Sequence, residues 1–100
     1  MRVVLDQTGF DKPLRVDADG AARQPGPNEV LIRVEACGVC YRDLIDRAGR
    51  IPYMQLPVVP GHEAVGRVVA LGTGASDFRV GDRVATMHRD CCGHCSACKT

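Results

Sequence analysis

Residues 61–66 read Gly-His-Glu-Ala-Val-Gly, a pair of metal-capable side chains bracketed by glycines and set just before an apolar run. His62 and Glu63 are adjacent side chains that can bind a metal, and Cys40 offers a thiolate about twenty positions upstream. Sulfur, imidazole nitrogen and carboxylate oxygen are the ligand types of zinc, and three protein ligands are typical of a catalytic site with an open position. The stretch therefore predicts a metal site at the start of a strand.

The strand itself is expected over residues 64–71, an apolar run in which Gly66 marks a bulge or a close backbone contact. Upstream of this strand, residues 29–36 are rich in β-branched side chains and partly alternate between apolar and polar residues, which predicts a second long strand. Shorter strands are expected at 2–5, 14–17 and 84–87.

Little helix is expected between these strands. Residues 40–48 have the composition of one short helix, which Gly49 would end. Residues 50–60 hold three prolines and predict an extended loop, and a cysteine-rich loop is expected from His88 onward. Many short strands, one helix and no alternation of strand and helix indicate a mostly β domain, barrel-like or sandwich-like.

Composition narrows the class of protein. One hundred residues suit a single small domain with a modest core. The net charge of +1 gives no field that would attract nucleic acid or a membrane surface, so neither is expected as a partner. No apolar run is long enough to cross a bilayer, and the N-terminus lacks the organisation of a signal peptide. We expect a cytoplasmic protein.

Six cysteines need an explanation in such a chain. Without a secretion signal, metal binding is a better explanation than a disulfide framework. Cys92, Cys95 and Cys98 have a spacing that lets a tight loop wrap one ion. Cys37 is expected to be a buried, inert side chain. For Cys91, burial as an inert side chain and metal binding both stay open. An alternative is a thioredoxin-like pair of Cys37 with Cys40.

The order of these motifs resembles the zinc-dependent medium-chain dehydrogenases, the alcohol dehydrogenase superfamily. The resemblance implies a mostly β, GroES-like, partly open barrel with a short helix and a zinc-lobe loop. Four pieces carry it, followed by the cysteine cluster: the strand at 29–34 running into Cys37-Gly-Val-Cys40, then Asp43, then Gly61-His62-Glu63 with Gly66 and Gly72, then Val-Gly-Asp-Arg-Val at 80–84.

The resemblance also implies roles for individual residues. Cys40 and His62 match two ligands of the catalytic zinc, and Glu63 matches a glutamate that can approach the metal. Asp43 matches a carboxylate that holds the histidine ring, although it could instead cap the helix. Cys92, Cys95 and Cys98 match three ligands of a structural zinc. The fourth is expected beyond the chain, with His88, His94 and Cys91 as possible substitutes nearby.

Arg42 departs from the pattern of alcohol-oxidising members, which carry Ser or Thr there to relay the alcohol proton. Arginine has donors but no acceptor, so it cannot take that proton. Ile45, at the usual next relay position, is also inert. The segment looks more like that of acrylyl-CoA reductases, in which Arg42 would help to hold an anionic substrate or the cofactor phosphates.

The sequence contains no Gly-x-Gly-x-x-Gly, so the Rossmann domain of the family is absent and NAD or NADP would be bound mainly outside this chain. We expect residues 1–100 to be the N-terminal part of the catalytic domain, truncated inside the structural-zinc lobe and inactive alone. The full-length form is expected to transfer hydride between the nicotinamide and a small-molecule alcohol or carbonyl, or an enoyl thioester, as a homo-oligomer. The alternatives are a non-catalytic zinc-binding module and a thiol-disulfide protein.

Overall fold

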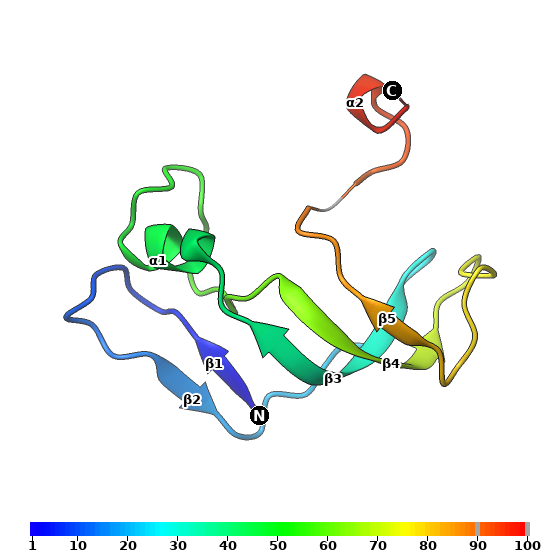
Figure 1. The fold of residues 1–100 in the computed structure, drawn as a ribbon, viewed down its shortest axis with the longest axis horizontal. Helices are drawn as coiled ribbons and strands as arrows, with labels where there is room; N and C mark the ends of the chain where they lie inside the picture. Colours follow the sequence, from blue (N-terminus) through cyan, green and yellow to red (C-terminus); the bar gives the residue numbers. More distant parts are fainter. Residues whose placement is uncertain (90, 100) are drawn as a thin grey trace.

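The computed structural model describes residues 1–89 and 91–99, and within them the chain is mostly strand with two short helices (Figure 1). An antiparallel pair, β1–β2, forms one sheet, and β3, β4 and β5 form an antiparallel sheet in that order. The described strands do not close into a barrel. The elements are β1 (Arg2–Val4), β2 (Arg15–Asp17), β3 (Val30–Gly38), α1 (Tyr41–Arg47), β4 (Glu63–Leu71), β5 (Arg83–Ala85) and α2 (Ser96–Lys99).

Strands β3 and β4 are the longest elements of the described chain and pair with each other. They run antiparallel over nine residues each, with register shifts between Leu31 and Ile32 and between Val34 and Ala36. Gly66 lies opposite Val34, and a Cβ there would collide with the carbonyl oxygen of Arg33. The expected close backbone contact at Gly66 is confirmed, while the extra residue of the neighbouring bulge, Glu35, lies on the partner strand β3.

The core is small. Val4, Leu5 and Val68 are the buried hydrophobic residues of the described chain. Leu5 also exchanges two backbone hydrogen bonds with Val58, of 2.8 and 3.1 Å, and so ties the end of β1 to the loop that precedes β4. Many other large apolar side chains are exposed, Val34 at 56% among them, as expected of a domain with open sheet faces.

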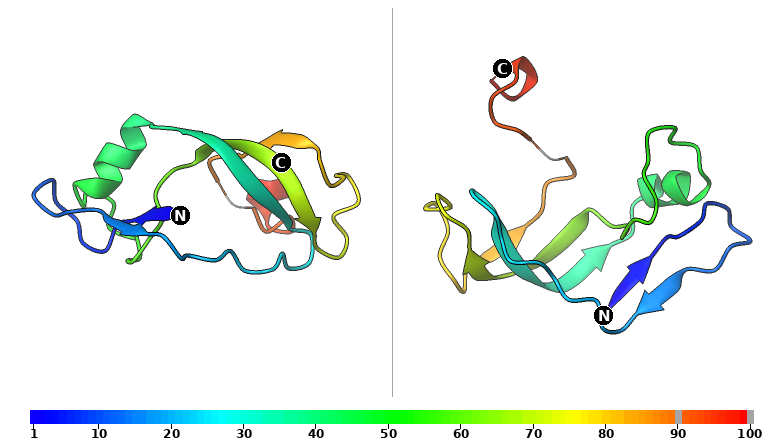
Figure 2. Two further views of the ribbon diagram at one scale, coloured as in Figure 1. Left: turned by 90° about the horizontal axis from the view of Figure 1, so that it is seen from below. Right: turned by 180° about the vertical axis from the view of Figure 1, so that it is seen from behind.

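Helix α1 begins one residue after Cys40, its N-cap, and ends before Ala48, its C-cap. Gly49 follows with φ of 75°, a left-handed conformation that glycine adopts without strain, so the expected stop is confirmed. This helix follows the C-terminal end of β3 and precedes the 50–60 loop (Figures 1 and 2), and its N-cap Cys40 therefore comes two residues after the end of that strand.

Helix α2 lies apart from the other helices and strands of the described chain (Figure 2). The sequence predicted only loop there, and over 96–99 that prediction is wrong. The carbonyl of Cys95 accepts hydrogen bonds from the amides of Cys98 and Lys99, at 3.1 and 3.2 Å, and closes one helical turn. Among the described residues, no helix is long and apolar enough to cross a membrane.

Candidate metal centre

The fold brings together the three residues that the sequence singled out as ligands of a catalytic metal. Single ligand atoms of Cys40, His62 and Glu63 lie within 4.8 Å of one another. Cys40 stands at the N-terminus of α1, just after β3, and the other two residues lie at the start of β4. Because β3 and β4 pair antiparallel, the end of one strand lies beside the start of the other, which explains how residues distant in sequence meet.

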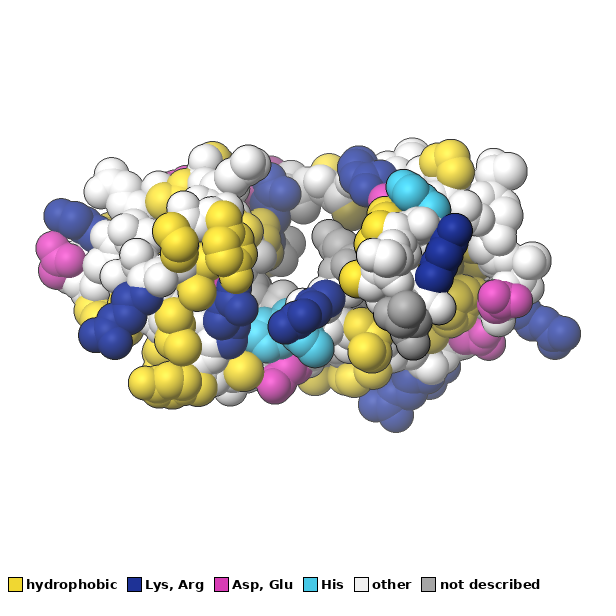
Figure 3. All heavy atoms as spheres, turned by 90° about the horizontal axis from the view of Figure 1, so that it is seen from above, with side chains coloured by type: hydrophobic (Ala, Val, Ile, Leu, Met, Phe, Trp, Pro, Cys, Tyr) yellow, Lys and Arg dark blue, Asp and Glu magenta, His cyan; other side chains and the backbone are white. Residues whose placement is uncertain are grey.

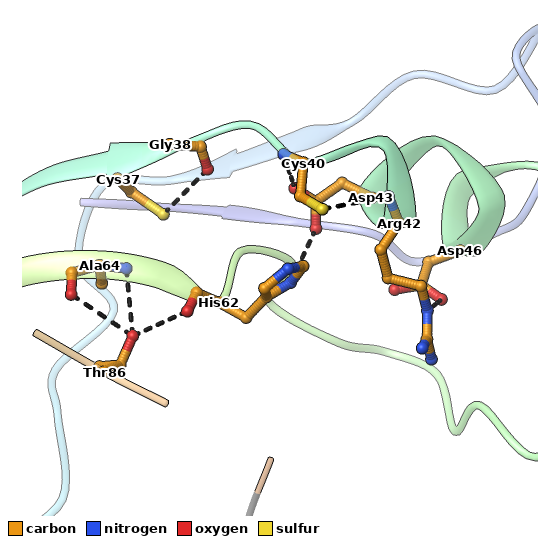
Figure 4. A network of polar contacts seen from close by, with 9 residues as sticks. All are labelled: Cys37, Gly38, Cys40, Arg42, Asp43, Asp46, His62, Ala64 and Thr86. Carbon is orange, nitrogen blue, oxygen red and sulfur yellow. Dashed lines mark hydrogen bonds and ion pairs between the residues drawn. The ribbon is translucent and has the colours of Figure 1, made fainter. Parts of the chain in front are cut away.

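Asp43 lies between two of these ligands (Figure 4). Its Oδ2 accepts a hydrogen bond of 2.9 Å from the backbone N–H of Cys40, and its Oδ1 is 3.5 Å from Nδ1 of His62. The carboxylate thus completes a capping box at the start of α1 and also faces the imidazole ring. Both roles that the sequence left open for Asp43 are compatible with this geometry.

The same contact leaves the other ring nitrogen of His62 free for a metal. Oδ1 of Asp43 is buried without a hydrogen-bond partner, and the side chains of Asp43 and His62 are only 15% and 24% exposed. An imidazole that binds a metal through one nitrogen usually donates its other N–H to a carboxylate, which would satisfy this oxygen.

The donor set fits a zinc ion. Zinc bonds to sulfur, nitrogen and oxygen of about 2.0–2.3 Å place ligand atoms roughly 3–4 Å apart around one tetrahedral ion. A separation within 4.8 Å closes to that range with small side-chain rotations. Cys40 and His62 are half-buried and Glu63 is exposed, as suits a site whose carboxylate can exchange with solvent or substrate.

Arg42 is already paired. Its Nε lies 2.8 Å from Oδ1 of Asp46, one turn along α1. The hydrogen bond and charge of Asp46, with a smaller contribution from Tyr53, raise the pKa of Arg42. Arg42 and Asp46 therefore line the site as an ion pair.

A cavity of about 900 Å³ opens beside the ligands. Its apolar lining includes Ile51, Met54 and Val59 of the 50–60 loop and Met87, which follows β5. In the space-filling view, histidine side chains lie at a hollow between the two ends of the molecule (Figure 3).

Two residues beside the centre were missed by the sequence prediction. His88 was considered only for the zinc lobe, but it lines this cavity, and its ring centroid is 6.5 Å from that of His62. Thr86, two positions earlier, also lines the cavity. No local pattern marks either residue, because the pairing of β4 with β5 brings them there.

The second cysteine cluster also assembles. The sulfur atoms of Cys92 and Cys98 are 3.9 Å apart, and those of Cys95 and Cys98 are 3.5 Å apart. Backbone N–H groups of His94 and Cys95 lower the pKa of the Cys92 thiol from 9.0 to about 7. The Nδ1 of His94 lies 2.7 Å from the carbonyl oxygen of Cys92, so the ring is turned to the backbone.

Cys37 and Cys91 are both exposed, so the expected burial of Cys37 is wrong. Cys37 lies near the end of β3, beyond the part of the sheet that the small core covers, and its thiol contacts the carbonyl oxygen of Gly38 at 3.6 Å. All the cysteines of the described chain are free, including Cys37 and Cys40.

Comparisons with known proteins agree on one family. The profile of the alcohol dehydrogenase GroES-like domain matches residues 26–100. The chain is 43% identical to the alcohol dehydrogenase notN of Aspergillus sp. (strain MF297-2), with 98% of the chain and 28% of that protein covered. It is 41% identical to an acryloyl-coenzyme A reductase of Sulfurisphaera tokodaii, with 76% of the chain and 23% of that protein covered.

A solved structure carries the same fold. Mycobacterial Rv1454c, complexed with NADPH, superposes with a TM-score of 0.72 at 42% identity, over 84% of this chain and 25% of that one. The chain spans about a quarter of the length of each of these relatives. The mostly β, GroES-like, open architecture expected from the sequence is confirmed.

Proposed function

The chain belongs to the alcohol dehydrogenase GroES-like family of oxidoreductases, and from that premise we propose that residues 1–100 form the zinc-binding part of a nicotinamide-dependent dehydrogenase or reductase. The observation that carries the proposal is the convergence of Cys40, His62 and Glu63 around one point, with Asp43 facing the histidine. A zinc ion held there would act as a Lewis acid on a substrate oxygen.

The residues of this chain have distinct roles in the proposal. Cys40 and His62 would bind the metal, and Glu63 would approach it when water or substrate exchanges. Asp43 would keep the proton of His62 on Nδ1, so that the other nitrogen stays a ligand. The apolar wall from Ile51, Met54 and neighbouring residues would exclude water from the reacting atoms.

The nicotinamide would be bound mainly by residues outside this chain, because the chain has no dinucleotide fingerprint. The similarity to a protein complexed with NADPH supports a nicotinamide as the hydride carrier. We therefore expect activity only in a polypeptide that joins these residues to a nicotinamide-binding domain.

Reduction of an activated double bond is a second candidate, and Arg42 favours it. Arginine cannot accept the proton of an alcohol, and Asp46 holds Arg42 in place beside the cavity. The similarity to an acryloyl-coenzyme A reductase supports the same candidate.

The test is a rate assay on a polypeptide that contains this chain and a nicotinamide-binding domain. Reduction of NAD⁺ and NADP⁺ would be followed with alcohols, and oxidation of NADH and NADPH with aldehydes and with enoyl thioesters. We expect turnover that is lost after metal chelation and in His62→Ala, but kept in His94→Ala as the matched control. Full turnover in the metal-free protein would refute the zinc proposal, and the preferred substrate would decide between the two reactions.

A further inference from the structure

The hydroxyl of Thr86 lies between two backbone groups that flank the Glu63 ligand (Figure 4). Its Oγ1 is 2.8 Å from the carbonyl oxygen of His62, to which it donates, and it accepts a hydrogen bond of 3.1 Å from the N–H of Ala64. The backbone N–H of Thr86 also donates to the carbonyl of Ala64 at 2.9 Å. One residue thus fixes the main chain on both sides of Glu63.

This hydroxyl takes the place of one backbone hydrogen bond that would extend the ladder between β4 and β5. The ladder between β4 and β5 runs from Arg67 opposite Arg83 to Val65 opposite Ala85. A further antiparallel rung would join Ala64 and Thr86 through two backbone hydrogen bonds. Only the bond from the Thr86 N–H is formed between backbones, and the side-chain oxygen takes the place of the Thr86 carbonyl.

The opposite side of the same segment is held by β3. Gly38 pairs with Glu63 and Cys37 pairs with Ala64, and Cys40 follows two positions after Gly38. The start of β4 is therefore fixed between the end of β3, which leads to Cys40, and Thr86. The separation of Cys40 from His62 and Glu63 therefore depends both on the pairing with β3 and on the hydrogen bonds to Thr86.

We propose that Thr86 is a positioning residue that sets His62 and Glu63 at metal-binding distance from Cys40. The inference rests on the metal centre proposed above. Without the hydroxyl, the carbonyl of His62 and the N–H of Ala64 lose their partner, and the segment can rotate about its remaining bonds to β3. Outer partners of metal ligands change metal affinity by about 10–100-fold. Because Thr86 is exposed and water can replace part of its contacts, we expect a loss of roughly tenfold.

The experiment is a Co²⁺ titration of the full chain in a background that carries Cys92→Ser, Cys95→Ser and Cys98→Ser, which removes the thiols of the second cysteine cluster. The readout is the thiolate-to-cobalt charge-transfer band, which reports a cysteine ligand directly. Thr86→Val removes the hydroxyl and keeps the shape of the side chain, Thr86→Ser keeps the hydroxyl, and Thr73→Val makes the same change in the turn after β4. Circular dichroism checks that each variant has the fold of the parent.

We expect the band to disappear in Cys40→Ala, to need about tenfold more Co²⁺ in Thr86→Val, and to stay within threefold of the parent in Thr86→Ser and Thr73→Val. Unchanged affinity in Thr86→Val, with the band still dependent on Cys40, would overturn the role of Thr86 and leave the metal centre standing. Tenfold weaker binding in Thr86→Ser would also overturn it, even if Thr86→Val did not fold. A band that survives Cys40→Ala would overturn the metal centre itself, and the inference with it.

Discussion

Replacement of Asp43 by asparagine separates the two tasks of this side chain. One carboxylate oxygen accepts from the N–H of Cys40 at 2.9 Å, and the other faces Nδ1 of His62 at 3.5 Å. Asparagine has one acceptor oxygen and one NH₂ group. If its oxygen keeps the bond to Cys40, the NH₂ group faces the Nδ1–H of His62, and two donors oppose each other.

The magnitudes follow from these contacts. A hydrogen bond to a charged group contributes about 1.5–3 kcal/mol and a neutral one about 0.5–1.5 kcal/mol, so Asp43→Asn should lower the unfolding free energy by about 1 kcal/mol. Loss of the partner that orients the histidine should weaken zinc binding by about 10–100-fold. Asp43→Ala removes both contacts and should cost the helix cap about 1 kcal/mol more.

The assay is competition for zinc against a chromophoric chelator, with urea unfolding on the same samples. Asp46→Asn is the matched control, because it changes a carboxylate on the same helix that pairs with Arg42 instead of His62. Zinc affinity in Asp43→Asn within twofold of the parent, in a background that carries Cys92→Ser, Cys95→Ser and Cys98→Ser, would refute the idea that Asp43 orients a ligand.

Three further predictions concern the fold. Leu5→Ala leaves a cavity at a residue that is only 1% exposed, and it should lower the free energy of unfolding, measured in urea, by about 2–5 kcal/mol. A change below about 1 kcal/mol would contradict the burial of Leu5 in the core. Gly66→Ala puts a methyl group against the carbonyl of Arg33 and should cost about 1–3 kcal/mol by the same measurement, whereas a neutral effect would contradict the close approach. The hydrogen bond from Arg23, and a backbone N–H, lower the pKa of Glu29 from 4.5 to about 2, so its stabilising contribution is complete above about pH 4.5 and is lost as pH falls through 2. Carboxyl NMR should report that midpoint, and an ordinary value near 4.5 would contradict the pairing.

Strands β3 and β4 and helix α1 could be predicted because the sequence patterns that mark them are local. The β-branched runs predicted β3 and β4, and Gly49 marked the end of α1. The adjacent His62 and Glu63, with Cys40 upstream, predicted residues that the fold does bring together. Their role as ligands remains a prediction until metal is measured.

The features that were missed depend on the pairing of strands distant in sequence and on packing, which no local sequence pattern predicts. His88 and Thr86 reach the centre because β5 pairs with β4, and a three-residue strand carries too little sequence signal to give its register. Cys37 was expected to be buried from its residue type, but exposure at the end of β3 depends on how far the small core extends. The single turn of α2 is too short for helical periodicity to mark it.

The most direct test of the central claim is the zinc content of three purified variants, Cys40→Ala, His62→Ala and Cys95→Ala. We predict that Cys40→Ala and His62→Ala each lose the zinc of the proposed catalytic centre, and that Cys95→Ala keeps it. Zinc that is lost only in Cys95→Ala would contradict the account and indicate a binding module without a catalytic centre. Absence of zinc together with a reversible disulfide between Cys37 and Cys40 would contradict it as well, in favour of thiol-disulfide chemistry.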